Sequence, residues 1–341
     1  MRLFLAAAVA LVVCLGSLFG ETTASAVKKE SAPVPPLFTG PLLTPSGHVV
    51  PRGFVNFEPY AFVNVTTGKY DDDWNSSSVP NFVNVNWQGP IFIGLTPMSD
   101  ILLVPQASWN STMGVSNLVF NDFIVEYDLA LVQDTRTNKI PGVKIYIQET
   151  FPTGQYERLD PQKLGTDAGG RGTFATNVGF VITRVFHMYD DHFLALRLNP
   201  FYTFRTKVDV KGVNAYGGAK DTDARVDPGD SYGAFFGAEY NLSRHWALAL
   251  DVAGSYEYKT TFKGNPGTLS SLASPEAIQF SLAPAIEYNF NASVGIIAGA
   301  WFTVAGKNSS RFASGAIAIN YFGPIPTGTK YQYIQTGGGG I

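Results

Sequence analysis

The residues best suited to proton transfer or metal binding in this sequence are its four histidines, His48, His187, His192 and His245. Two of them flank a pair of aspartates, in the run His187, Asp190, Asp191, His192, and zinc accepts both imidazole and carboxylate ligands. A hydrolase would instead need one histidine within hydrogen-bond reach of a serine or an aspartate. Either chemistry depends on where the surrounding elements place these side chains.

Carboxylates offer a second chemistry, because paired Asp and Glu side chains can act as general acid and general base. The candidates are Glu126, Asp128, Glu239, Asp251 and Glu287. Other acidic residues lie close together in the sequence, in one cluster of Asp71, Asp72 and Asp73 and in a second of Asp221, Asp223, Asp227 and Asp230. Such clusters carry the hard oxygen ligands that Ca²⁺ prefers, but in a surface loop they are solvated charge, which is the interpretation we favour.

Residues 165–172 have the composition of a phosphate-binding loop. The run lacks the terminal Lys-Ser/Thr pair and precedes a predicted strand, so no helix N-terminus would face a phosphate. Cys14, the only cysteine, lies in the leader described next, so the mature chain has no disulfide and no thiolate. We therefore predict no catalytic residue, no metal and no cofactor.

The N-terminus has the order of a secretory signal peptide. Arg2 is followed by an apolar stretch from Leu3 to Phe19, and Ala24-Ser25-Ala26 provides the small residues of a cleavage site before Val27. Residues 1–26 are therefore predicted to be removed during export, and residues 27–50, which contain five prolines, form a lead-in that could plug the domain that follows.

The composition predicts a membrane protein that crosses with strands. Only 15% of the residues are charged, against about 25% in ordinary soluble domains, while 45% are hydrophobic and 13% aromatic. After Val27 no run of about 18 apolar residues remains to form a spanning helix. A net charge of −3 also argues against a nucleic-acid partner.

Hydrophobic residues alternate with polar ones from Gly53 onward, as in half-buried strands. Leu248, Leu250 and Val252, for example, are interleaved with Asp251. Twelve such segments are predicted, at 53–65, 82–95, 100–112, 121–133, 140–151, 172–186, 192–208, 231–242, 246–258, 277–289, 293–304 and 310–322. Their lengths suit tilted membrane crossings.

The connections alternate between short turns and long loops, which is typical of outer-membrane barrels. Long loops are predicted at 66–81, 152–171, 209–230 and 259–276, and moderate ones at 113–120 and 305–309. We predict an all-β fold, a transmembrane antiparallel up-and-down barrel over residues 51–323, followed by a tail at 324–341. A soluble sandwich or lipocalin-type barrel is the alternative, but it would carry more charge on its outer face.

Aromatic residues near the segment ends are predicted to form the girdles at the two membrane interfaces. They include Trp87, Trp109, Tyr127, Trp246, Tyr258, Tyr288, Trp301 and Tyr321. The histidines of the strand region, His187, His192 and His245, fall at predicted periplasmic turns, so a hydrolytic site at the outer rim is not expected.

Three short motifs resemble a known family: Gly40-Pro41-Leu42-Leu43-Thr44-Pro45, the Phe-Pro-Thr-Gly of residues 151–154, and Leu164-Gly165-Thr166-Asp167. Together they are similar to outer-membrane transporters of the "MetA-pathway of phenol degradation" family. The resemblance covers residues 38–323 and implies a barrel that transports small molecules, with no catalytic residues to carry over. The chain departs from this pattern after Asn320-Tyr321-Phe322, where a further tail follows.

We therefore expect a monomeric passive channel in the outer membrane for small solutes, including apolar or aromatic ones. The expected lumen-lining residues, which would steer solutes by charge, are Glu58, Glu126, Asp128, Arg197, Arg205, Asp251 and Glu287. The expected partners are outer-membrane lipid and lipopolysaccharide, the solute, and the barrel-assembly machinery. A surface protein that binds partners through its loops and an outer-membrane hydrolase are the alternatives.

Overall fold

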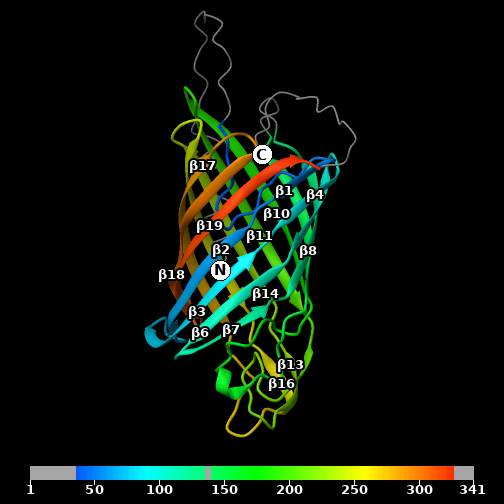
Figure 1. Ribbon diagram of the computed structural model, residues 1–341, viewed down its shortest axis with the longest axis vertical. Helices are drawn as coiled ribbons and strands as arrows, with labels where there is room; N and C mark the ends of the chain where they lie inside the picture. The colour runs from blue at the N-terminus through cyan, green and yellow to red at the C-terminus, as the bar shows by residue number, and fades with distance from the viewer. Residues whose placement is uncertain (1–35, 135–139, 326–341) are drawn as a thin grey trace, which may run out of the picture. The chain divides into compact units, whose positions relative to one another are not determined.

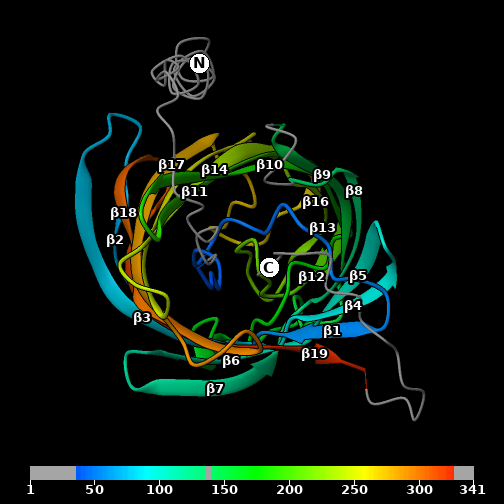
Figure 2. The same cartoon turned by 90° about the horizontal axis from the view of Figure 1, so that it is seen from above.

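The alternating segments close into an antiparallel β-barrel in the structure, a computed structural model that describes residues 36–134 and 140–325 (Figures 1 and 2). The ring contains twelve strands, β1 (Phe54–Phe57), β4 (Ile91–Thr96), β5 (Ser99–Val104), β8 (Phe123–Val132), β9 (Gly142–Phe151), β10 (Ala175–Tyr189), β11 (His192–Arg205), β14 (Ser231–Asn241), β15 (Trp246–Glu257), β17 (Ala277–Asn289), β18 (Val294–Lys307) and β19 (Ser310–Pro324). The predicted fold class is confirmed.

The ring is closed by its first and last strands. β1 pairs antiparallel with β19 from Phe54 opposite Pro324 to Phe57 opposite Tyr321. The described residues contain no helix that is both long and apolar enough to span a bilayer. Residues 1–35 and 326–341, on which the signal peptide and most of the tail were predicted, lie outside the described part of the chain.

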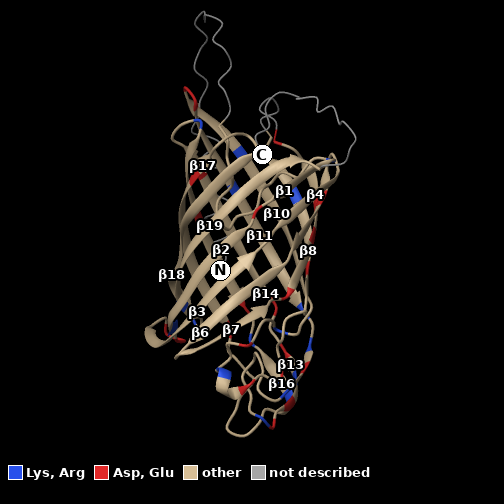
Figure 3. Cartoon of the chain, viewed as in Figure 1, with Lys and Arg blue, Asp and Glu red and all other residues tan. Residues whose placement is uncertain are grey.

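The predicted orientation of the strand faces is confirmed by β15. Leu248, Leu250 and Val252 are each at least 40% exposed on the outer face, whereas Ala249 and Asp251 between them are buried inside. Charged residues are sparse along the strands of the barrel and more frequent in the connections at its ends (Figure 3). Since side chains alternate between the two faces of a strand, the apolar face of each strand forms the outer surface and the other face surrounds the lumen.

A line of prolines interrupts the first strands of the ring. Pro59, Pro90 and Pro105 lack the N–H that a strand ladder needs, and the ladder breaks at each of them. Beyond this line the same chain segments continue as β2 (Tyr60–Tyr70), β3 (Ser76–Gln88), β6 (Gln106–Thr112) and β7 (Val115–Phe120). The predictions of a long loop at 66–81 and of a loop at 113–120 were therefore wrong, because these residues extend the sheet.

β7 forms an edge where it leaves the ring, and among the described strands it pairs only with β6. Side chains bridge this edge to the loop after β9. Asn117 Nδ2 donates to Thr166 Oγ1 at 2.6 Å, and Asn121 Nδ2 donates to Gly169 O at 3.2 Å. The glycine-rich run at 165–172 thus has a packing role here: a Cβ on Gly169 would lie 2.2 Å from the carbonyl oxygen of Phe120.

The long connections build a small subdomain of their own at one end of the barrel (Figure 1). It comprises the short 3-10 helix η1 (Pro161–Lys163) and a three-stranded sheet of β12 (Val208–Lys211), β13 (Asp223–Asp227) and β16 (Thr261–Asn265). Its core is formed by Val208, Val210, Ala224, Val226 and Leu272. The predicted loops at 209–230 and 259–276 are therefore ordered, because their alternating valines bury a common apolar face. We call this the loop end, and the opposite end, with its short connections, the turn end.

Candidate functional site: the lumen and its internal segment

The described residues before β1, from residue 36 on, run inside the barrel (Figure 2). Leu42 and Val50 of this stretch are at most 5% exposed, and Leu42 packs against the inward-facing Phe62 and Ile297. We refer to residues 37–50 as the luminal segment. It contains no helix or strand, so its backbone N–H and C=O groups need partners from the barrel wall.

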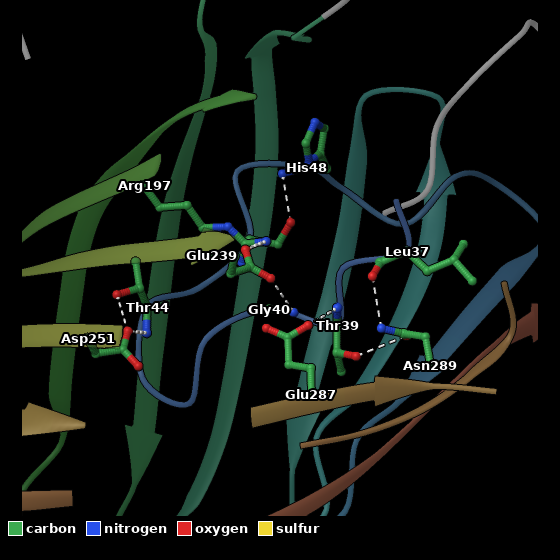
Figure 4. Close-up of polar contacts among 11 residues, drawn as sticks. Leu37, Thr39, Gly40, Thr44, His48, Arg197, Glu239, Asp251, Glu287 and Asn289 are labelled. Carbon is green, nitrogen blue, oxygen red and sulfur yellow. Dashed lines mark hydrogen bonds and ion pairs between the residues drawn. The ribbon is translucent and has the colours of Figure 1, made fainter. Parts of the chain in front are cut away.

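Three inward carboxylates of neighbouring strands supply those partners (Figure 4). Glu287 accepts a hydrogen bond from the backbone N–H of Thr39 at 2.8 Å, and Glu239 accepts one from Gly40 at 2.9 Å. Asp251 accepts three, from the Leu43 N–H at 3.1 Å, the Thr44 N–H at 2.9 Å and the Thr44 hydroxyl at 2.5 Å. Hydrogen bonds to a carboxylate are stronger than those between neutral groups.

A fourth carboxylate holds the far end of the segment. Asp100, which is 1% exposed on β5, accepts from the Val50 N–H. We call Asp100, Glu239, Asp251 and Glu287 the carboxylate seat. Asn289 adds neutral contacts, since its Nδ2 donates to Leu37 O at 2.9 Å and its Oδ1 accepts from Thr39 Oγ1 at 3.1 Å (Figure 4).

One buried ion pair lies at the centre of the seat. Arg197 Nη2 is 2.6 Å from Glu239 Oε2, and the two side chains are 7% and 0% exposed. Gly40 permits this contact, because its φ of +109° is unfavourable for other residues and a Cβ there would lie 2.9 Å from Arg197 Nη1. Arg197 therefore compensates the charge of Glu239 and lies close to the backbone of the segment at Gly40.

Wall glycines leave room for the segment. A Cβ on Gly237 would lie 2.8 Å from Pro41 Cγ, and one on Gly94 would lie 2.0 Å from the Pro51 oxygen. The segment and the wall therefore fit closely. A cavity of about 130 Å³ remains at the turn end, lined partly by residues 37–46 and by Tyr60 and Phe322.

The sequence-predicted lumen residues do not form one group. Arg197, Asp251 and Glu287 meet at the luminal segment as described above. Two others are held at 2.8 Å by neighbours on the wall, Glu126 by Gln148 Nε2 and Asp128 by Lys144 Nζ.

The remaining two lie near opposite ends of the barrel. Glu58 Oε1 accepts from Asn56 Nδ2 at 2.7 Å and from Asn320 Nδ2 at 2.6 Å. Arg205 Nη1 donates to Gly229 O at 2.6 Å at the loop end. Asp100 and Asn289 were missed by the sequence reasoning. The alternation along each strand places both side chains on the inner face, but it does not predict a contact with the segment before β1.

An apolar patch faces the lumen beside the carboxylate seat. It contains Phe62, Ala249, Ala283, Ile297, Ala316 and Ala318, with Trp301 packed against it. The prediction that Trp301 belongs to an interfacial girdle was therefore wrong. Trp301 pairs with the buried Ser314 on the inner face, and its Nε1 donates to Ser281 Oγ at 2.9 Å. Small residues around it leave space that a ring can fill.

The strand-region histidines contact backbone oxygens at the turn end. His187 Nε2 is 2.6 Å from Asp190 O, His192 Nδ1 is 3.0 Å from Asn241 O, and His245 Nδ1 is 2.6 Å from Asn289 O. No group of three or more His, Cys, Asp or Glu residues within 36–134 and 140–325 is arranged to hold a metal ion.

His48 lies in the luminal segment rather than in a strand. Burial, followed by the positive charges of Arg197 and Lys144, lowers the pKa of His48 from 6.5 to about 4. The imidazole is therefore neutral at pH 7. Its backbone N–H donates to Ser46 Oγ at 3.1 Å, which shapes the turn that leads to Val50 (Figure 4).

The acidic loop residues are engaged with protein groups. Lys307 Nζ lies 3.1 Å from Asp72 Oδ1, and this contact lowers the pKa of the Asp72 carboxyl. The N–H and the hydroxyl of Thr268 donate to Asp221, and they lower its pKa as well. These contacts agree with the interpretation of both clusters as surface-loop charge.

Known structures share this architecture. An outer membrane channel from Pseudomonas putida F1 aligns with a TM-score of 0.62 over 81% of this chain and 98% of that chain, at 14% identity. The chain has the fold of outer-membrane β-barrels. The translocator domain of the autotransporter NalP from Neisseria meningitidis aligns less well, with a TM-score of 0.43 at 8% identity over 79% of this chain and 87% of that chain.

The Pseudomonas putida toluene transporter TodX aligns with a TM-score of 0.36 at 12% identity, over 79% of this chain and 89% of that chain. No family model and no curated protein matches the sequence. The similarity to the outer membrane channel, at 14% identity, establishes the fold of this barrel.

Proposed function

We propose that this protein is a passive channel of the outer membrane for small molecules, with the luminal segment as its plug. The observation that carries the proposal is a closed barrel whose lumen contains a segment without helix or strand, held by side chains of the wall. The side-chain contacts that hold the segment can be broken without opening the ring, whereas the hydrogen bonds between strands cannot. The short motifs that resemble the phenol-degradation transporter family, and the fold shared with an outer membrane channel, support the same function.

The orientation follows from the connections. In outer-membrane barrels the short turns face the periplasm and the long loops face outward. We therefore place the turn end in the periplasm and the loop-end subdomain outside, next to lipopolysaccharide. Arg205 near the loop end and Glu58 near the turn end would then act on solutes at the two mouths. Export by the signal peptide, assembly by the barrel-assembly machinery and a monomeric state complete the proposal.

Single-channel conductance in planar bilayers tests the proposal directly. A variant lacking residues 27–50 is expected to conduct several-fold more than the full-length protein, because the lumen is emptied. A heat-modifiable gel shift, measured on both proteins, controls for barrel formation. If the variant keeps the shift and its conductance equals that of the full-length protein, the plug role is excluded; if neither protein conducts, the channel is excluded.

A second candidate function is supported by the ordered loop-end subdomain. Its apolar core of Val208, Val210, Ala224, Val226 and Leu272 fixes a surface that protrudes beyond the barrel, and a fixed surface suits recognition of a partner. Replacing residues 208–227 and 261–274 by short linkers separates the two functions. Loss of surface binding with unchanged conductance would assign binding to the subdomain and conductance to the barrel, whereas unchanged surface binding would exclude the second function.

We propose no enzymatic activity for this chain. A hydrolase at the outer rim would need a histidine there, and the three strand-region histidines contact backbone oxygens at the turn end. Analysis of the lipids in membranes that overproduce the protein tests this directly. Accumulation of lysolipid or deacylated lipopolysaccharide, absent from membranes of cells that lack the protein, would restore the hydrolase.

A further inference from the structure

The loop-end subdomain contains a cavity of its own, with a volume of about 340 Å³. It lies where three segments of the chain converge, and backbone hydrogen bonds join them. The Arg158 N–H donates to Lys211 O at 3.0 Å, and the Gly212 N–H donates to Thr222 O at 3.0 Å. A Cβ on Gly212 would lie 3.6 Å from Arg158 Cα and 3.9 Å from Lys220 O. The walls of this cavity are therefore fixed by the backbone.

Three cations line the cavity, which we call the basic hollow: Arg158, Lys211 and Lys220. All three side chains are exposed, whereas Leu159 and Thr222, which also line the hollow, are only 5% and 4% exposed. The hollow thus has a buried floor and a rim of positive charge that solvent reaches. Side chains of this length can turn toward a bound group without any change in the backbone.

The rim cations have few partners within the protein. Among the described residues, no side chain pairs with Lys211 Nζ or Lys220 Nζ. Arg158 has one distant partner, since its Nε lies 3.8 Å from Glu157 Oε1. The other oxygen of this carboxylate, Oε2, accepts from the Lys211 N–H at 2.8 Å. Three like charges are therefore held around one hollow with a single carboxylate at its edge.

Other acidic residues of the subdomain are engaged elsewhere, although both signs of charge occur throughout it (Figure 3). Asp221 accepts from the N–H and the hydroxyl of Thr268 at 3.0 and 2.8 Å. Asp227 Oδ2 lies 2.8 Å from Lys207 Nζ, and Asp160 caps the short helix η1. None of these carboxylates lines the hollow. The positive charge of the rim is therefore left for a group from outside the protein.

We propose that the basic hollow binds a phosphate monoester. Three cations and Glu157 leave a local charge of about +2, and a phosphate monoester carries about −1.5 to −2 at pH 7. Its oxygens can accept a bidentate pair of hydrogen bonds from Arg158 and single ones from the two lysines. The volume leaves room for part of the molecule that carries the phosphate.

Two sources offer this chemistry outside the cell, the phosphate groups of lipopolysaccharide and soluble phosphate esters. The site itself does not depend on the channel function. Only its access to lipopolysaccharide rests on the proposed orientation, in which the loop end faces outward.

Isothermal titration calorimetry on the full-length protein in a neutral detergent tests the site, with glucose 1-phosphate as the probe at pH 7.5 and low salt. We expect saturable binding of one molecule for each chain, and no heat from glucose. Because the rim is exposed, added salt should weaken the binding by screening. Absence of saturable binding at low salt would overturn the proposal.

A pair of double variants makes the test specific. Lys211→Gln with Lys220→Gln is expected to weaken binding by about tenfold or more, because two charge-assisted contacts are lost. Lys259→Gln with Lys263→Gln removes the same charge from exposed positions of the subdomain that do not line the hollow, and it should leave the affinity within about twofold. The heat-modifiable gel shift shows whether each variant forms a barrel. Equal weakening in both variants would overturn the site.

The pH dependence distinguishes a phosphate from other anions. The second proton of a phosphate monoester is lost near pH 6, so glucose 1-phosphate should bind more tightly at pH 7.5 than at pH 5. Glucose 6-sulfate carries one negative charge at both pH values, and it should bind more weakly with little change. Equal affinity of the two esters at pH 7.5 would overturn the assignment of phosphate.

Competition identifies the source of the phosphate. If intact lipopolysaccharide displaces glucose 1-phosphate and chemically dephosphorylated lipopolysaccharide does not, the site takes a phosphate of the membrane surface. If neither displaces it, the site takes soluble phosphate esters. Displacement by both forms would overturn recognition of phosphate. None of these titrations depends on conductance, so failure of the channel proposal and failure of this site are separate results.

Discussion

The carboxylate seat and the apolar patch around Phe62 lie side by side in one lumen, yet they differ in how they contact the luminal segment. The seat directs Asp and Glu side chains at backbone N–H groups of the luminal segment, and each of the four carboxylates accepts at least one hydrogen bond from it. The apolar patch presents the buried ring of Phe62 and the half-buried ring of Trp301. The comparison teaches that four carboxylates of the wall hold the protein's own chain through its backbone, whereas the apolar patch beside them contacts the same segment through Leu42 and Leu43.

The largest effect on this comparison is expected from Arg197→Met. Glu239 would then be left as an unpaired buried charge, and breaking such a pair from one side costs about 3–5 kcal/mol. We expect the luminal segment to leave its seat, so that conductance rises and the unfolding temperature falls. Arg197→Met combined with Glu239→Leu removes both charges and should recover much of the stability. Equal instability of the single and double variants would contradict the assigned pairing.

Asp251→Ala is expected to have the next largest effect. It removes the acceptor of the Leu43 and Thr44 N–H groups, and each buried amide left unsatisfied costs about 1–3 kcal/mol. Conductance measured in bilayers should rise. Glu58→Gln is the matched control, since Glu58 bonds to Asn56 and Asn320 rather than to the segment. A similar rise in both variants would show that loss of negative charge, and not release of the segment, is responsible.

Gly237→Ala tests the fit between the segment and the wall. The added Cβ would lie 2.8 Å from Pro41 Cγ and from Thr44 Oγ1, and overpacking of this kind costs about 1–3 kcal/mol. We expect a smaller rise in conductance than for Asp251→Ala. Gly315→Ala on the outer face has no atom within 4 Å of its Cβ and should behave as the parent protein. An unchanged Gly237→Ala channel would mean that the segment is not seated as described.

The smallest effect is expected from acidification. Because burial lowers the pKa of His48 to about 4 in the seated segment, against about 6.5 for an exposed histidine, the released segment binds the proton more readily. Seating is therefore fully stable above pH 6.5 and weakens as the pH falls toward 4, by on the order of 1–3 kcal/mol. Conductance should rise over this range, and less steeply in His48→Gln. Identical pH profiles of the parent and of His48→Gln would show that the change in conductance comes from the carboxylates alone.

The sequence alone determined the class and most of the wall of this protein. A period of two is visible wherever each strand has one face in a different environment from the other, as in Leu248, Leu250 and Val252 around Asp251. The strand faces and the short turns follow from that local pattern, and closure is expected because every backbone group within the membrane must be paired. The prolines at 59, 90 and 105 were equally visible, but that they align across neighbouring strands depends on register, which the period does not specify.

Only the tertiary structure decided what occupies the lumen. Thr39 and Glu287 are 248 positions apart, and no local pattern indicates that a carboxylate will meet a distant backbone amide. Trp301 shows the same limit, because an aromatic residue on a strand suits either face and only its pairing with Ser314 places it inside. Local periodicity distinguishes one face of a strand from the other, but the partners of the inward face are set when the ring closes around the segment.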